Sequence, residues 1–251
     1  MSSGGSDELI YEAKLSVLNR VDGSAQLSIS SRKDLDEGEL GIICSITGPI
    51  ESKARQESPQ QSNLEISVMP HIGVASTREK LLEYKLKLVL DRVIDSFEYP
   101  RQLIQIVLQI LNKPNYEDDT TIGSDDMNDF FSLNDLNGCL ISTYLALIDS
   151  GISMKSSFLS SCCIINSNNQ LTTDFNKNDL INSKSLHLIV YDLRNGKCNN
   201  LIYSESIGEF DEQIFFKNVL DKCKKEIENL NTKVIKNCIT EKFKNDYIWK
   251  A

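Results

Sequence analysis

The sequence predicts an α+β fold, in which strands and helices mix without the regular alternation of a doubly wound sheet. Two observations support this. The predicted elements run in the order several strands, helix, strand, helix, strands, helix. The 251 residues, 40% hydrophobic and 25% charged, are enough to bury one large core. No G-x-G-x-x-G, P-loop, G-x-S-x-G or H-E-x-x-H motif is present.

The first third of the chain is predicted to form short strands after an N-terminal segment of small and polar residues. We expect residues 1–8 to be disordered, because they hold little apolar surface to bury. Apolar residues then alternate with polar ones or form compact runs, separated by turn residues and polar loops, which is typical of strands. The predicted strands are Leu15–Leu18, Gln26–Ile29, Gly41–Ile46 and Leu64–Val68.

The first helix begins with a clear signal. Ser76 and Glu79 fit a capping box, in which the hydroxyl caps an early N–H and the carboxylate reaches back to the cap residue. Leucines and valines follow at helical spacing from Leu82, and Pro100 prevents continuation. A strand buried on both faces is predicted from Leu103 to Leu111.

An acidic stretch interrupts the domain. Residues 112–129 hold six acidic side chains and little apolar content, which favours a solvated, flexible loop. The second helix is expected to open at Ser132 and Asp135 and to run to about Asp149. Asp135 is interpreted as a helix-capping acid.

The last third is predicted to hold strands, a hairpin and a helix. Asn195-Gly196 is a strong hairpin turn signal. We expect the domain to span residues 9–230 and a Lys-rich, partly helical tail to span 231–251. The predicted strands and helix are Cys162–Ile165, Leu186–Tyr191, Asn200–Ser204 and Asp211–Asn229.

Charge and cysteine content exclude several protein classes. The net charge of −9 argues against a protein that binds nucleic acid over a whole basic face. Seven cysteines without a C-x-x-C pair predict reduced, buried thiols rather than a zinc site or a disulfide framework. The chain shows no secretory signal and no membrane-length apolar run. We expect no metal and no cofactor.

Several segments match a known family in order along the chain. They are Asn19–Ser24, Gly48–Glu51, Lys53–Glu57, Gly73–Lys80, Tyr99–Leu103 and Ala146–Ile152. In these segments the chain resembles the RNase PH-like ring subunits of the eukaryotic RNA exosome. The resemblance covers about residues 15–227 and is dense between Thr47 and Leu111.

The resemblance implies a fold and a set of partners. The RNase PH fold, which resembles domain 2 of ribosomal protein S5, packs two β-α-β units into one globular domain. Six such subunits form a ring around an RNA channel, S1/KH proteins cap it, and a separate ribonuclease lies on the opposite side. The implied location is nucleus, nucleolus and cytoplasm, with no membrane.

The resemblance also indicates where catalysis would reside. Active relatives hold phosphate with an arginine at the start of the helix that ends in the Ala-Leu-x-Asp motif. Counted back from Ala146–Asp149, that position is Leu136, which cannot neutralise an anion. Asp135 beside it would repel phosphate.

The catalytic acids are degenerate by the same comparison. An ungapped count places the two key acids on Thr172 and Asn178. Asp174 and Asp179 lie close by, and a one-residue shift would bring Asp179 into register. We therefore expect no catalytic residue and a loss of phosphorolysis.

Basic residues in the matching segments are the candidates for RNA contact, because Lys and Arg can bind a phosphate backbone without reading sequence. The alternative for Arg55 and Arg101 is pairing with carboxylates, and for Arg78 and Lys80 it is plain solvation. The full candidate set is Lys53, Arg55, Arg78, Lys80 and Arg101.

The favoured function is a non-catalytic ring subunit that lines an RNA channel and supports 3′-to-5′ RNA processing. Two alternatives stay open at this point. One is a residual phosphorolytic or hydrolytic exoribonuclease that uses Asp174 and Asp179. The other is a stand-alone RNA-processing adaptor outside the exosome.

Overall fold

A computed structural model describes residues 9–30, 39–112, 125–167, 169–175, 179–180 and 182–247. The charged residues 31–38, the polar residues 1–8 and residues 113–124 of the acidic stretch lie outside these ranges. No helix within the described ranges is long and apolar enough to cross a membrane.

The first half of the described chain forms a five-stranded sheet in the order β1-β2-β3-β5-β4. All neighbours are antiparallel except β4 and β5, which α1 joins by a parallel β-α-β crossover. Inward-facing apolar residues alternate along β3, as expected for a strand with one buried face. The bounds are β1 Ile10–Leu15, β2 Gly23–Ser30, β3 Leu40–Glu51, β4 Asn63–Met69, α1 Thr77–Val93, a 3₁₀ turn Ser96–Glu98 and β5 Gln102–Asn112.

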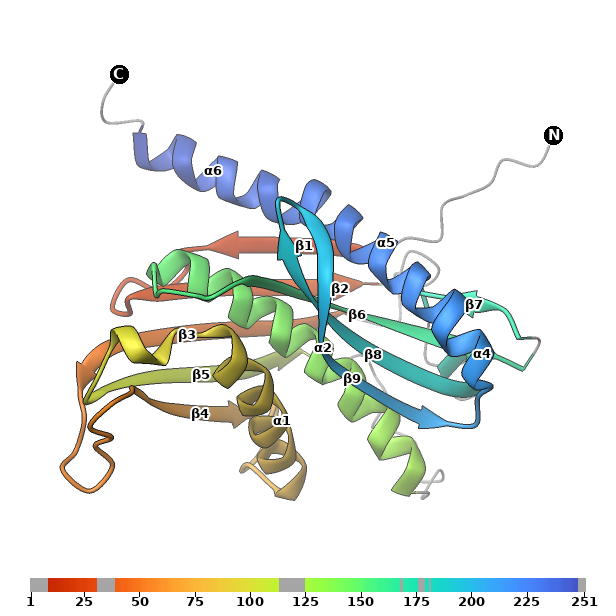
Figure 1. The fold of residues 1–251 in the computed structure, drawn as a ribbon, viewed down its shortest axis with the longest axis horizontal. Helices are drawn as coiled ribbons and strands as arrows, with labels where there is room; N and C mark the ends of the chain where they lie inside the picture. The colour runs from red at the N-terminus through yellow and green to blue at the C-terminus, as the bar shows by residue number, and fades with distance from the viewer. Residues whose placement is uncertain are drawn as a thin grey trace.

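The second half forms an antiparallel sheet in the order β7-β6-β8-β9. Helix α2 follows β5, contacts strands of both sheets and leads into β6, so this β-α-β unit runs from one sheet to the other (Figure 1). The bounds are α2 Asp125–Ser150, β6 Ser157–Asn166, β7 Leu171–Thr172, β8 Ser183–Arg194 and β9 Lys197–Gly208.

A long helical arm crosses the molecule after β9 (Figure 1). Its first part packs on the second sheet, and α6 reaches β1 of the first sheet. The tail that was expected to be partly helical is helical through Tyr247. The arm comprises α4 Glu212–Ile214, a π-helical turn Phe215–Val219, α5 Leu220–Leu230, a second π-helical turn Asn231–Ile235 and α6 Lys236–Tyr247.

Close backbone approach holds α2 against the first sheet. A Cβ atom on Gly138 would lie 2.7 Å from Ile42 Cδ1, and one on Gly23 would lie 2.5 Å from the Ala146 carbonyl oxygen. A Cβ atom at either position would force its neighbours to move, and at Gly23 those neighbours are backbone atoms of α2, so the glycines allow α2 to pack closely on β2 and β3.

The cysteines lie in the core, as the sequence predicts. All seven are free and buried. Cys162 and Cys163 are neighbours on β6 and point to opposite faces: the Cys162 thiol donates to the Leu133 carbonyl of α2, and Cys163 faces Cys223 of α5. Burial raises the pKa of the Cys162 thiol well above its ordinary value, so it stays protonated and unreactive.

Candidate RNA-contacting surface and the degenerate catalytic positions

The position expected for a phosphate-binding arginine is part of the hydrophobic core. Leu136 is 1% exposed and packs in the cluster that joins the two sheets through α2. A side chain at this place points into apolar surroundings rather than toward solvent. It therefore cannot contribute to an anion site, whichever residue type it carries, without rearrangement of the core.

Asp135 does not cap a helix, contrary to the prediction. Helix α2 begins at Asp125, so Asp135 lies about three turns inside it and is 3% exposed. Its carboxylate accepts a hydrogen bond of 2.6 Å from Nη2 of Arg78, in the first turn of α1. The prediction failed because residues 125–129 were assigned to the flexible acidic loop 112–129 for want of apolar periodicity, whereas they are the first residues of α2.

This ion pair also changes the assignment of Arg78. It was a candidate for RNA contact, or alternatively a solvated side chain, but its side chain is three-quarters covered and joined to a buried carboxylate. A charge held in this way is needed by its partner, because a buried carboxylate without a cation is strongly unfavourable. Arg78 is a structural link between α1 and α2.

The segment expected to carry catalytic acids is only partly described. Thr172 ends the short strand β7 and pairs with Ile164 of β6. Asp174 is 1% exposed, Asp179 is half-buried, and each takes part in a further polar or electrostatic contact. Asn178 lies outside the described residues.

The five basic candidates do not form one patch. Lys53 and Arg55 lie on the β3–β4 loop, and Arg101 immediately precedes β5. The Arg101 N–H donates to the Ser58 carbonyl of that loop over 3.1 Å, so all three residues lie at the end of the sheet where β4 and β5 begin. The other two, Arg78 and Lys80, follow the far end of β4 (Figure 1). Seven strand residues at about 3.3 Å each separate the two groups by about 20 Å.

The cations at the start of β4 are the more accessible group. Lys53 and Arg55 are exposed. Arg101 is 70% exposed, and its Nε lies 3.4 Å from a Glu57 carboxylate oxygen, as the carboxylate alternative for this residue expected. An ion pair at that exposure is weak, so a phosphate can replace the carboxylate. Lys80 pairs with Glu83 at 2.8 Å along the exposed side of α1.

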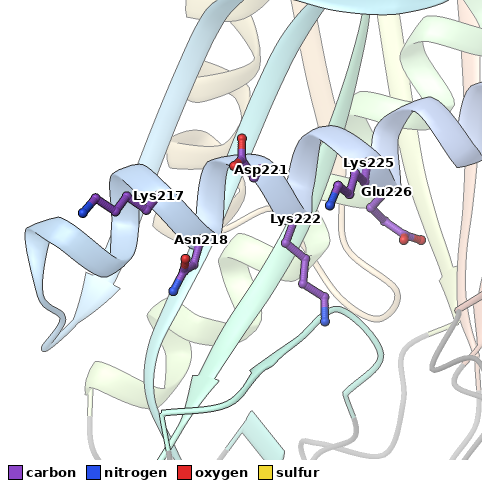
Figure 2. A pocket seen from close by; sticks show the side chains of 6 residues that line it. All are labelled: Lys217, Asn218, Asp221, Lys222, Lys225 and Glu226. Carbon is purple, nitrogen blue, oxygen red and sulfur yellow. The ribbon is translucent and has the colours of Figure 1, made fainter. Parts of the chain in front are cut away.

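A groove of about 480 Å³ runs along α5 near β7 and presents a second set of cations (Figure 2). Its lysines alternate with acids at helical spacing: Asp221 lies four residues from both Lys217 and Lys225. Lys222 points toward the β7 segment and donates to the Leu171 carbonyl over 2.7 Å. The groove is thus close to neutral and offers little attraction for a polyanion.

Sequence reasoning missed the role of Asp149, although it quoted the motif that contains it. The Asp149 carboxylate ends α2 and accepts hydrogen bonds from the Ser16 hydroxyl at 2.7 Å, the Ser24 N–H at 2.8 Å and the Lys242 ammonium of α6. Burial alone would raise the pKa of Asp149, but these bonds outweigh burial and lower it. The single acid of the Ala146–Ile152 motif therefore joins the end of α2 to β2, to the turn after β1 and to α6.

Comparison with known proteins agrees with this fold. Residues 11–153 match the RNase PH family model, described as the 3′ exoribonuclease family, domain 1. The chain is 39% identical over 208 residues to the exosome complex component RRP46 of Saccharomyces cerevisiae, which covers 82% of this chain and 85% of that protein. It is 31% identical over 208 residues to exosome complex component rrp46 of Schizosaccharomyces pombe, covering 81% and 79%.

A solved structure shares the fold. The crystal structure of rice (Oryza sativa) Rrp46 superposes with a TM-score of 0.71 at 19% identity, covering 91% of this chain and 96% of that one. The resemblance inferred from the sequence segments and the α+β fold that it implied are both confirmed. The chain belongs to the RNase PH family, the 3′ exoribonuclease family, through domain 1.

Proposed function

We propose that the chain is a structural subunit of the RNA exosome core ring, and that it supports 3′-to-5′ RNA processing without cleaving RNA itself. The observation that carries this proposal is the pair of relatives at 39% and 31% identity, each called an exosome complex component and each matched over about four fifths of its length. Ring closure requires two different contact faces on each subunit.

The absence of phosphorolysis is part of the proposal and rests on two features. Phosphorolysis must hold a phosphate dianion beside the anionic RNA backbone, which requires a cationic, preorganised pocket. At the expected position the chain has buried Leu136 instead of a cation. Arg78, which is bonded to the residue before Leu136, already contacts the Asp135 carboxylate.

We infer that the cations at the start of β4 are the residues that contact RNA. Lys53, Arg55 and Arg101 are exposed on adjoining loops, and they can touch phosphates without selecting a base sequence. We place this end of the first sheet toward the channel. Arg78 and Lys80, at the opposite end of β4, contribute to the fold and to the surface of α1.

The assembly and its location complete the proposal. The chain closes a six-membered ring with other RNase PH-like subunits, S1/KH proteins cap that ring, and a separate nuclease receives the RNA. The expected location is nucleus, nucleolus and cytoplasm, which fluorescent tagging of the full chain tests.

Two measurements test the proposed function. The purified chain, given labelled single-stranded RNA with phosphate and Mg²⁺, should release no nucleoside diphosphate, whereas an active RNase PH under the same conditions should do so. Turnover that Asp179→Asn abolishes would establish the residual nuclease instead. Affinity purification should recover other RNase PH-like chains in equal amounts, and recovery of the chain without them would favour a stand-alone adaptor.

A further inference from the structure

An exposed aromatic surface lies where β9 ends and the helical arm begins. Phe210 is 40% exposed and Phe216 is 66% exposed. Both pack on Phe215, with ring centroids 5.6 Å and 5.4 Å away. Large apolar side chains that remain together at a surface commonly mark a contact site.

Buried side chains hold Phe210 in a fixed position. Phe210 meets the ring of buried His187 edge to face at 4.8 Å, and that histidine bridges Ser185 and Ser206 at 3.0 Å and 2.8 Å. Aromatic groups that are fixed before binding lose little conformational entropy when a partner arrives.

The backbone around these rings also departs from regular structure. Gly208 has φ +100°, and a Cβ atom there would lie 2.2 Å from the Lys184 carbonyl oxygen, so the turn that leads to Phe210 requires glycine. Residues 215–219 form a π-helical turn, a rare form that is frequent at functional sites. This turn carries Phe216.

Exposed carboxylates border the rings. Glu209, Asp211 and Glu212 flank Phe210 in sequence and are all exposed. Glu212 and Phe216 are four residues apart, about one turn, so they lie on the same side of the arm. Asp211 also caps the arm by accepting from the Gln213 N–H at 3.0 Å. These residues, with the two exposed rings, form what we call the acidic-aromatic surface.

We propose that the acidic-aromatic surface binds an arginine-bearing segment of a partner protein, a role beyond ring formation. A guanidinium stacks on an aromatic face while its N–H groups bind a carboxylate in two-pronged fashion. Phe216 and Glu212 offer that combination one turn apart. The net charge of −9 adds long-range attraction for a cationic segment.

The same charges disfavour the other occupants. RNA would bring phosphates next to three carboxylates, which repel them. A second copy of the chain, related by a two-fold axis, would bring the same carboxylates toward each other. Lys217, which follows Phe216 and lines the end of the α5 groove, adds one positive charge beside these three carboxylates (Figure 2).

The test uses the full chain and an array of twelve-residue peptides that each carry one or two arginines in varied apolar contexts. Each peptide has a twin with citrulline, the neutral isostere of arginine. Binding is measured by fluorescence anisotropy for the wild type, Phe216→Ala, Glu212→Gln and the matched control Phe243→Ala, which removes a 57% exposed ring from α6.

We expect some arginine peptides to bind the wild type more tightly than their twins. Phe216→Ala and Glu212→Gln should each weaken binding about five- to tenfold, as loss of a central contact does, and Phe243→Ala should leave it unchanged. Circular dichroism verifies that the variants fold. The proposal is overturned if every twin binds equally well, or if Phe216→Ala instead weakens oligouridylate binding or abolishes self-association.

Discussion

Arg78 and Asp135 join the first turn of α1 to the middle of α2 by a hydrogen bond of 2.6 Å between opposite charges. The Asp135 side chain is almost fully buried, and that of Arg78 is about one-quarter exposed. Asp135 precedes Leu136 in α2, so this internal ion pair lies next to the position that the sequence comparison predicted for a phosphate-binding arginine.

Breaking this pair should destabilise the fold. Arg78→Met leaves a buried carboxylate without its cation, which costs about 3–5 kcal/mol of unfolding free energy. Urea denaturation measures the change. The double variant Arg78→Met, Asp135→Leu should recover much of the loss, since it removes both charges, and strictly additive losses would contradict the interpretation.

Restoring the missing arginine should not restore catalysis. Leu136→Arg places a cation in the apolar core, so we expect a loss of more than about 3 kcal/mol of unfolding free energy and no phosphate-dependent release of nucleoside diphosphates. Leu136→Met, the volume-matched control, should cost less than about 1.5 kcal/mol. A Leu136→Arg protein of ordinary stability that degrades RNA would show that the site is preserved.

The two groups of cations should differ in their effect on RNA. Replacing Lys53 and Arg55 by glutamine should weaken binding of single-stranded RNA by the assembled ring and reduce the salt dependence of the affinity. The matched variant Lys80→Gln, at the other end of β4, should leave both quantities unchanged. Filter binding at several salt concentrations measures them, and equal effects from both ends would refute the separation of roles.

The first helix shows how far the sequence could predict the structure. The capping box at Ser76 and Glu79 is present: the Glu79 carboxylate accepts from the Ser76 N–H at 2.7 Å. The hairpin turn at Asn195-Gly196 is also confirmed, since both residues have positive φ, at 54° and 79°. Such signals are local in sequence and carry their own hydrogen-bonding or backbone requirement, and so they can be recognised without the fold.

Predictions failed where tertiary contacts decide the structure. The segment Leu15–Leu18 was predicted as the first strand, but β1 is Ile10–Leu15 and Leu18 is exposed. Ser16 has φ 53° and donates to Asp149, 133 residues away. Apolar alternation cannot reveal a turn that a distant carboxylate holds. For the same reason the Arg78–Asp135 pair was not foreseen.

Asp149 should couple the end of α2 to the C-terminal helix. Asp149→Asn weakens bonds from Lys242, Ser16 and Ser24, and we expect a loss of about 2–3 kcal/mol of unfolding free energy, as for hydrogen bonds to a charged group. Because the folded-state pKa is lowered, this contribution is present above the unfolded pKa and disappears as pH falls through the folded pKa. Urea titrations at pH 7 and at strongly acidic pH measure it. A variant as stable as the wild type at pH 7 would refute this role.

His187 should give the stability a second pH dependence. Burial lowers the pKa of His187 to about 4 from its ordinary 6.5. The unfolded chain therefore binds a proton between these values that the folded chain does not. Stability should be greatest above pH 6.5, fall as pH decreases toward 4, and lose nothing further from this group below 4. At about 1.4 kcal/mol per pH unit the total is at most about 3.5 kcal/mol.

The histidine contribution can be isolated, because the chain holds only one other histidine. His187→Gln keeps a side chain that can hydrogen-bond to Ser185 or Ser206, yet it removes the titration. The slope of unfolding free energy against pH between 4 and 6.5 should therefore flatten. His71→Gln, at an exposed loop position, is the matched control and should keep the wild-type slope. If both variants retain that slope, the acid sensitivity arises elsewhere, and protonation of His187 does not account for the pH dependence of the stability.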